Sequence, residues 1–143
     1  MKPLKTMMLG ISVAGIMAGC SSNDVPKCDD SDAKELVLQI ATSSLRDGLS
    51  KVKVGISYAE LEQGVNTPMD DKKWWNALKA QKKEIDDLLE QLSLQSIRTD
   101  DIDEKLKKTQ CSAELVVGNK TVPIRYKLEM TSDNELYATV YGL

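Results

Sequence analysis

The chain has 143 residues, with 19 Lys and Arg against 22 Asp and Glu for a formal charge of −3, and it contains no His. This length predicts one domain, and an apolar content of 41% is sufficient for a hydrophobic core. The absence of His excludes Ser-His-Asp and Cys-His nucleophile pairs, imidazole general bases and the usual His-containing zinc sites. No motif for catalysis, metal binding or cofactor binding is present, so we expect a protein that is not an enzyme and that uses neither a cofactor nor a metal.

Residues 1–19 have the pattern of a secretory signal peptide. Lys2 and Lys5 precede an apolar run over residues 7–18, which is too short to cross a bilayer as a helix. The alternative is an N-terminal core helix, which the glycines in this segment disfavour. We therefore expect residues 1–19 to be removed from the mature chain.

The four residues Met17-Ala18-Gly19-Cys20 resemble the lipobox of bacterial lipoproteins, although Met17 stands where that family prefers Leu. The resemblance implies cleavage before Cys20 and acyl chains, such as palmitate, on Cys20. Two or three chains anchor a protein stably in a bilayer, whereas one binds only marginally. Cys20 is followed by Ser21 and not by Asp, so the resemblance also implies the periplasmic face of the outer membrane of a Gram-negative bacterium.

Loss of residues 1–19 would remove Lys2 and Lys5. The remaining 124 residues would carry 17 basic and 22 acidic side chains, a formal charge of −5. This balance disfavours nucleic acid and anionic lipid as partners, because both reward clustered Lys and Arg. The expected partners are therefore the bilayer, through acylated Cys20, and a protein of the cell envelope.

Two cysteines, Cys28 and Cys111, remain once Cys20 is lipidated. An even number of cysteines in an oxidising periplasm predicts one disulfide bond. A free nucleophilic cysteine is the alternative, and it is disfavoured because no His is present to lower a thiol pKa. Residues 20–27 are polar and interrupted by Pro, so we expect a flexible lipidated tether there and a single domain over residues 28–143.

Apolar residues at helical spacing predict a first amphipathic helix that ends near Gly48. Asp32 and Glu35 are spaced as a capping box at its start. The acidic residues at this helix start are alternatively a calcium loop, but they lack the twelve-residue spacing and the glycine of an EF-hand.

A second capping box, Ser57 with Glu60, predicts a short helix, whereas residues 51–57 are compatible with either a strand or a helix. Thr67 and Pro68 have the order of an N-cap and a first helical residue. The longest helix is predicted to follow them over residues 69–92.

After residue 92 the apolar period changes from that of a helix to the alternation of a strand. Strands are predicted over residues 92–98, 110–117, 122–131 and 136–141, with a charged turn over residues 100–108 and a type II′ hairpin turn at Gly118-Asn119. This order predicts an α+β fold in which N-terminal helices pack on one face of a C-terminal four-stranded antiparallel meander. The layout resembles cystatin-like and nuclear-transport-factor-like rolls.

Three short segments of the expected sheet, residues 96–99, 111–115 and 124–126, resemble a recurrent pattern in uncharacterised periplasmic lipoproteins. Their sequences are Ser-Ile-Arg-Thr, Cys-Ser-Ala-Glu-Leu and Ile-Arg-Tyr. The resemblance implies no specific activity.

Aromatic and basic residues supply the candidate partner surface. Trp74 and Trp75 point about 100° apart on a helix, so we expect Trp74 in the core and consider two places for Trp75, a partner surface or a position packed under the adjacent loop. On the strands, Tyr137 and Tyr141 share one face with Arg125 and Lys127 of the neighbouring strand. The candidate partner surface therefore comprises Trp75, Arg125, Tyr137 and Tyr141.

These expectations favour a non-catalytic binding or interaction module, anchored in the outer membrane and facing the periplasm. The alternative is an inhibitor or immunity protein against a periplasmic or secreted enzyme. That alternative predicts a protruding acidic loop formed by Asp100, Asp101, Asp103 and Glu104. The same residues are alternatively a cation site, but the neighbouring lysines favour a solvated turn.

Overall fold

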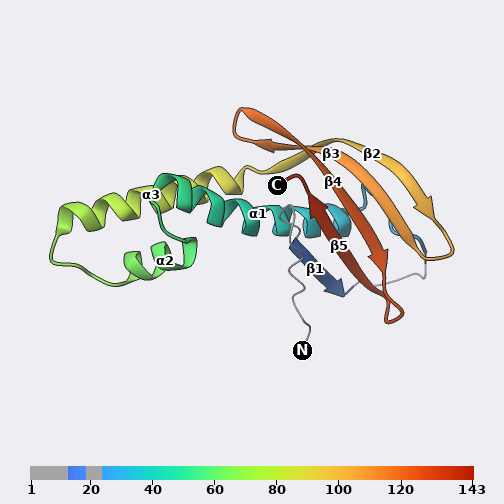
Figure 1. The fold of residues 1–143 in the computed structure, drawn as a ribbon, viewed down its shortest axis with the longest axis horizontal. Coiled ribbons are helices and arrows are strands. Elements are labelled where there is room, and N and C mark those ends of the chain that lie inside the picture. The colour runs from blue at the N-terminus through green and yellow to red at the C-terminus, as the bar shows by residue number, and fades with distance from the viewer. Residues whose placement is uncertain (1–12, 19–23) are drawn as a thin grey trace.

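The computed structural model describes residues 13–18 and 24–143, which form three helices and one five-stranded antiparallel sheet (Figure 1). The elements in chain order are β1 Val13–Ala18, α1 Ser31–Lys53, α2 Tyr58–Asn66, α3 Lys72–Glu90, β2 Ser93–Asp103, β3 Lys108–Val117, β4 Lys120–Met130 and β5 Glu135–Tyr141. The sheet order is β1-β5-β4-β3-β2. The predicted α+β class is confirmed, because three helices precede the four-stranded antiparallel meander β2–β5.

Strand β1 is the one element that the sequence pattern does not predict. It lies inside the segment expected to be a signal peptide, and it pairs antiparallel with β5 from Val13 opposite Val140 to Ala18 opposite Glu135. In the full chain this apolar segment therefore completes the sheet at one edge. Cys20, the expected lipidation site, lies outside the described residues.

Helix α1 is longer than predicted at its C-terminal end. The residue before it, Asp30, makes no side-chain cap hydrogen bond, so the expected capping box of Asp32 and Glu35 is wrong. The helix also continues through the exposed Gly48, whose cost of about 1 kcal/mol is outweighed by the packing of its last turns against α2 and α3. It ends before Gly55, which has a φ of 85° and donates its backbone N–H to the carbonyl oxygens of Ser50 and Lys51.

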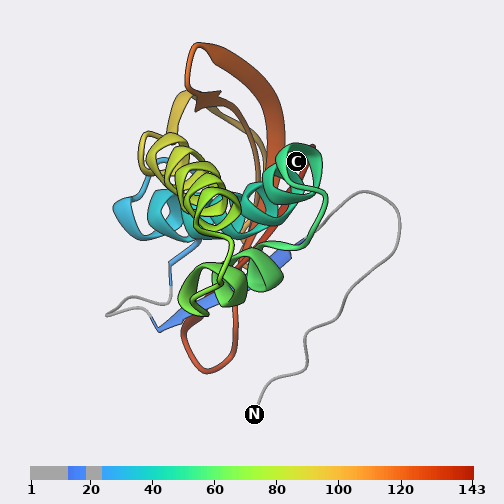
Figure 2. The same cartoon turned by 90° about the vertical axis from the view of Figure 1, so that its left-hand side faces the viewer.

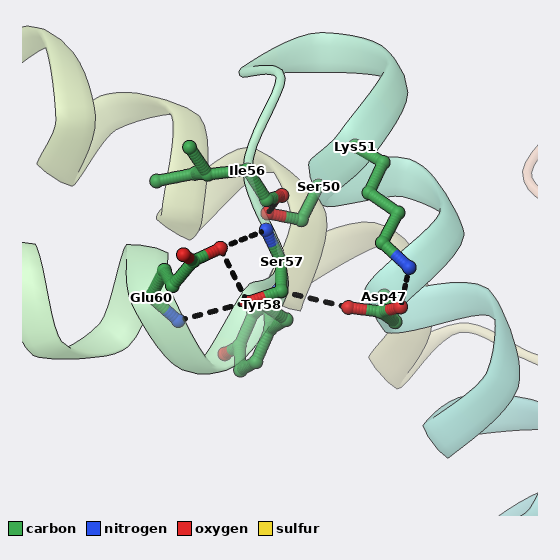
Figure 3. Close-up of polar contacts among 7 residues, drawn as sticks. All are labelled: Asp47, Ser50, Lys51, Ile56, Ser57, Tyr58 and Glu60. Atoms are coloured by element: carbon green, nitrogen blue, oxygen red, sulfur yellow. Dashed lines mark hydrogen bonds and ion pairs between the residues drawn. The ribbon is translucent and has the colours of Figure 1, made fainter.

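A compact set of hydrogen bonds joins α1 to α2 (Figure 3). The predicted capping box is confirmed, since Ser57 Oγ accepts from the N–H of Glu60 at 3.2 Å and the Glu60 carboxylate accepts from the N–H of Ser57 at 2.8 Å. Asp47 of α1 accepts from the N–H of Tyr58 at 3.1 Å, and Ser50 Oγ donates to the carbonyl of Ile56 at 2.8 Å. Residues 54–57 are thus a fixed turn and not a strand.

Helix α3 begins later than predicted. Asp71, and not Thr67, is the N-cap, and its carboxylate accepts from the N–H of Trp74 at 3.1 Å. Two ion pairs, each between residues four apart, lie along the helix: Lys82 with Asp86 at 2.7 Å and Lys83 with Asp87 at 2.5 Å.

Strand β2 extends through most of the segment predicted as a charged turn. Asp100, Asp101 and Asp103 belong to β2, and only residues 104–107 form the turn to β3. Two register shifts interrupt the pairing of β2 with β3, one between Gln95 and Arg98 and one between Thr99 and Asp101. The next turn, by contrast, is as predicted: Gly118 has a φ of 62° in the two-residue loop between β3 and β4.

The buried side chains form two clusters. The first lies between the N-terminal half of α1 and the inner face of β3, β4 and β5, and it includes Leu36, Ile40, Leu115, Tyr126 and Val140. The second joins the C-terminal half of α1 to α2 and α3 through Leu61, Leu78, Ile85 and Leu89. Figure 1 shows the result, a helical end that extends away from the sheet while α1 runs beneath it.

The predicted disulfide is confirmed, because Cys28 and Cys111 are bonded across 83 residues of sequence. Two buried hydrogen bonds act beside it: Tyr126 Oη donates to the carbonyl of Cys28 at 2.7 Å, and Thr109 Oγ1 donates to the carbonyl of Pro26 at 2.6 Å. Pro26 is itself buried. The fixed part of the domain therefore begins by Pro26, two residues inside the segment expected to be a tether.

We expect loss of the disulfide to destabilise the fold by roughly 4 to 5 kcal/mol, since it closes a loop of more than 80 residues in the unfolded chain. The paired substitution Cys28→Ala and Cys111→Ala, made in a Cys20→Ser background, should lower the free energy of unfolding in urea by that amount. Reductant should destabilise the parent to the same extent and leave the double variant unchanged. A loss under about 1 kcal/mol would contradict the prediction.

Buried Tyr126 should make the folded state less stable at alkaline pH. Burial, assisted by the negative charge of Asp29, raises the pKa of Tyr126 to about 12. The unfolded chain releases this proton near pH 10, so the folded state holds more protons between pH 10 and pH 12 and loses stability as pH rises through that window. Below pH 10, Tyr126→Phe should cost about 1 to 3 kcal/mol, because the carbonyl of Cys28 loses its donor.

Urea unfolding of the parent and of Tyr126→Phe at pH 8 and at pH 11 measures both effects. The stability difference between the two proteins should shrink at the higher pH, because only the parent carries the buried hydroxyl. Equal differences at both pH values would show that another group causes the alkaline loss.

Candidate functional site

The face of the meander opposite α1, called the outer face from here on, is the surface that the helices leave open (Figure 2). Strands β3, β4 and β5 alternate between buried residues on the α1 side and exposed or half-buried residues on the outer face. Outward positions on the two C-terminal strands are Arg125, Lys127, Tyr137, Thr139 and Tyr141. The structure thus brings together three of the four residues of the predicted partner surface, Arg125, Tyr137 and Tyr141.

One row of residues crosses all four strands of the outer face. Its members are in register, with Arg98 of β2 opposite Ser112, Ser112 opposite Arg125, and Arg125 opposite Tyr141. We call these four residues the arginine row. The three segments that resemble a recurrent lipoprotein pattern are neighbours here, since each contributes one member of the row.

The irregular edge strand β2 determines which of its side chains reach this row. Register shifts on both sides of Arg98 and Thr99 mark β-bulges, which change the direction of side chains along a strand. Thr99 lies opposite the disulfide-bonded Cys111, and its hydroxyl donates to Cys28 Sγ at 3.4 Å. Asp100, beside the second bulge, accepts a hydrogen bond from the hydroxyl of Ser112.

The charges on the outer face divide into paired and unpaired groups. Glu129 Oε1 is 2.9 Å from Lys127 Nζ and 3.6 Å from Lys108 Nζ, and this carboxylate raises the pKa of Lys127. The guanidinium groups of Arg98 and Arg125, in contrast, form no hydrogen bond or ion pair with any residue in the described ranges. Both side chains are exposed, Arg98 on the edge strand β2 and Arg125 on the central strand β4.

Two shallow hollows flank Arg125 and Tyr141. One, of about 810 Å³, is lined by all four members of the arginine row and by Glu114, among other residues. The second, of about 310 Å³, lies toward Asp100 and Lys127. An unpaired guanidinium is a planar donor that matches a carboxylate in two hydrogen bonds, and a tyrosine beside it adds an apolar contact surface. The arginine row is therefore suited to bind a carboxylate-bearing ligand.

Trp75 lies away from this face, on α3. Its Nε1 donates to the carbonyl of Val65 at 3.0 Å, and Lys79 Nζ lies 3.8 Å from the centre of its ring. Trp75 is thus held against the last turn of α2 and is not part of the outer face. Trp74 is 52% exposed, so the expectation that it would be the core member of the pair is wrong.

A second polar cluster, which the sequence pattern does not indicate, joins the three helices. Tyr58 Oη donates to Asp86, Asp86 also pairs with Lys82, and the Arg46 guanidinium lies 4.9 Å from the centre of the Tyr58 ring. Burial acts to raise the pKa of Asp86, but the hydrogen bonds from Lys82 and Tyr58 prevail and lower it. Tyr58, Lys82 and Asp86 satisfy one another and hold the helical end together, whereas Arg46 Nε is buried without a hydrogen-bond partner among the described residues.

No three His, Cys, Asp or Glu side chains within residues 13–18 and 24–143 are grouped closely enough to hold a metal ion. Among the helices that the structure describes, none is long and apolar enough to span a membrane.

No protein-family model, curated protein or solved structure matches this chain. The similarity to cystatin-like and nuclear-transport-factor-like rolls therefore stays a prediction from the order of the elements.

Proposed function

We propose that this protein is a lipid-anchored component of the bacterial envelope that binds a partner protein, without catalysis, through the outer face of its sheet. Anchoring rests on the lipobox-like residues that end in Cys20 and on the charged and apolar pattern before them. The Cys28–Cys111 disulfide is consistent with a periplasmic location, because disulfides persist in oxidising compartments. Attachment at the outer membrane follows from the same resemblance, through Ser21.

The observation that carries the binding role is the pair of unpaired guanidiniums in the arginine row. Lys51, Lys82 and Lys127 each form an ion pair with an acidic neighbour that offsets their charge. Arg98 and Arg125 form no ion pair with any described residue, although Asp100 and Glu114 lie in the hollows beside them and the domain is acidic overall. A partner segment with Asp or Glu side chains would supply the missing counter-charges, and Tyr141 between the two hollows would pack against that segment.

The alternative of an inhibitor or immunity protein depends on a protruding acidic loop. Asp100, Asp101 and Asp103 instead lie in β2, and Glu104 is the acidic residue that reaches the turn. The hydroxyl of Ser112 also binds Asp100. Three of the four acidic residues that this alternative places in a protruding loop therefore belong to the sheet.

Crosslinking in intact cells followed by purification tests the binding surface. The double variant Arg98→Ala and Arg125→Ala should recover the stoichiometric partner of the parent protein at least about tenfold less well, since hydrogen bonds to charged groups contribute about 1.5 to 3 kcal/mol each. The matched control, Lys105→Ala with Lys120→Ala, removes two exposed charges, one in the turn after β2 and one at the first residue of β4, and should recover it fully. Undiminished recovery by the arginine variant would rule out this face.

Fractionation tests the anchor independently. We expect the parent protein in the outer-membrane fraction, with a mass that shows loss of residues 1–19 and addition of acyl chains. Cys20→Ser should accumulate as an unprocessed precursor, and Ser21→Asp should move the processed protein to the inner membrane. A Cys20→Ser protein that is still processed and still anchored would refute lipidation at this residue.

A further inference from the structure

Strand β1 covers an edge of the sheet that would otherwise be open. In the full chain β1 pairs with six consecutive residues of β5, from Glu135 to Val140. All of β1 lies within residues 1–19, which the proposed function removes. The processed chain would therefore present β5 as a second edge of the meander, opposite β2.

The two edges of the meander differ in how they are protected. β2 has two bulges and a run of charged residues, Arg98, Asp100, Asp101 and Asp103, and both features discourage pairing with another strand. β5 has neither a proline nor a bulge, and its register with β4 is continuous from Arg125 opposite Tyr141 to Met130 opposite Leu136. Its sequence, Glu-Leu-Tyr-Ala-Thr-Val-Tyr, is rich in residues that favour strands. The β5 edge is a regular template for one more strand.

Helix α1, which lies beneath this edge, favours glycine at one position of the strand that pairs with β5. Gly15 lies opposite Ala138, and a Cβ atom built on it would be 2.8 Å from Leu36 Cδ1 and 3.2 Å from Ile40 Cγ1. The backbone of β1 therefore passes so close to α1 that a larger side chain would require both residues to move. Without β1, the apolar side chains of Leu36 and Ile40 would border an open groove along β5.

We infer that the β5 edge of the processed protein is a docking groove for an extended apolar segment of a partner protein, which adds to the sheet as β1 does in the precursor. The segment contributes backbone hydrogen bonds to β5 and places a glycine over Leu36 and Ile40. This inference rests on the proposed processing at Cys20. The chemistry of the occupant is that of β1, since β1 occupies the groove in the full chain.

A peptide of residues 12–19, with two lysines added for solubility and a fluorescent label, probes the groove. The protein is purified from membranes into nanodiscs, and its intact mass establishes that residues 1–19 are absent. We expect saturable binding by fluorescence anisotropy, together with slower hydrogen exchange of β5 amides when the peptide is present. The Cys20→Ser precursor retains β1 in place, so it should bind the peptide at least about tenfold more weakly.

Two peptide variants test the fit. Gly15→Ile adds a β-branched side chain above Leu36 and Ile40 and should weaken binding at least about tenfold. Ala14→Ile adds the same bulk one position earlier, opposite Thr139 on the outer face, and should bind within about twofold of the parent peptide. Equal binding of both variants would overturn the inferred groove.

The remaining outcomes separate this inference from the proposed function. Processed, monomeric protein that binds no peptide overturns the groove and leaves the anchor intact. A processed protein that dimerises through β5, detected by mass and by protection of β5 amides without peptide, assigns the edge to a second copy and also overturns it. An intact mass that still includes residues 1–19 refutes the proposed anchoring, and the groove with it.

Discussion

The attachment of residues 26–28 to the middle of the sheet is the constraint on which the rest of the structure depends. The disulfide fixes Cys28 to β3, while Thr109 and Tyr126 bind the carbonyl oxygens of Pro26 and Cys28. These three links join the residues just before α1 to two neighbouring strands that lie far from them in sequence. Helix α1 therefore starts at a fixed place beneath the sheet, and its apolar side chains cover the inner face. The remaining helices are carried to one end of the molecule, and the outer face of the meander is left uncovered.

The separation of the helical end from the uncovered outer face explains why charged side chains are arranged differently in these two parts of the molecule. Where α1, α2 and α3 meet, polar groups are partly buried, and Tyr58, Lys82 and Asp86 are paired with one another, although Arg46 Nε is not hydrogen-bonded to a described residue. The outer face is solvated, so no such requirement applies, and Arg98 and Arg125 form no ion pair with the described part of the chain. An exposed arginine without a counter-charge lowers the stability of the fold little by itself. Two of them in one row across the sheet, on either side of Ser112, form a surface that an acidic partner can complete.

The sequence predicts best those features that depend on neighbouring residues. The capping box at Ser57, the turn at Gly118 and the alternation of β4 each need only a few adjacent positions, and all three are confirmed. Arg125, Tyr137 and Tyr141 follow from that alternation, so most of the outer face was predictable. Arg98 was not, because its position depends on bulges in β2 that arise from pairing with β3. The end of α1 and the exposure of Trp74 were mispredicted for a similar reason, since distant packing decides both.

The proposed anchor and the proposed groove would arise from the same cleavage, close in sequence to the fixed Pro26. Five residues, 21–25, separate Cys20 from the fixed Pro26, so the two can lie at most roughly 20 Å apart. Under the proposed processing, cleavage before Cys20 creates the anchor and removes β1 at the same step. In the full chain β1 pairs with β5, so this regular sheet edge is not left open. Only the anchored form would then expose β5, so the groove would open where an envelope partner is within reach.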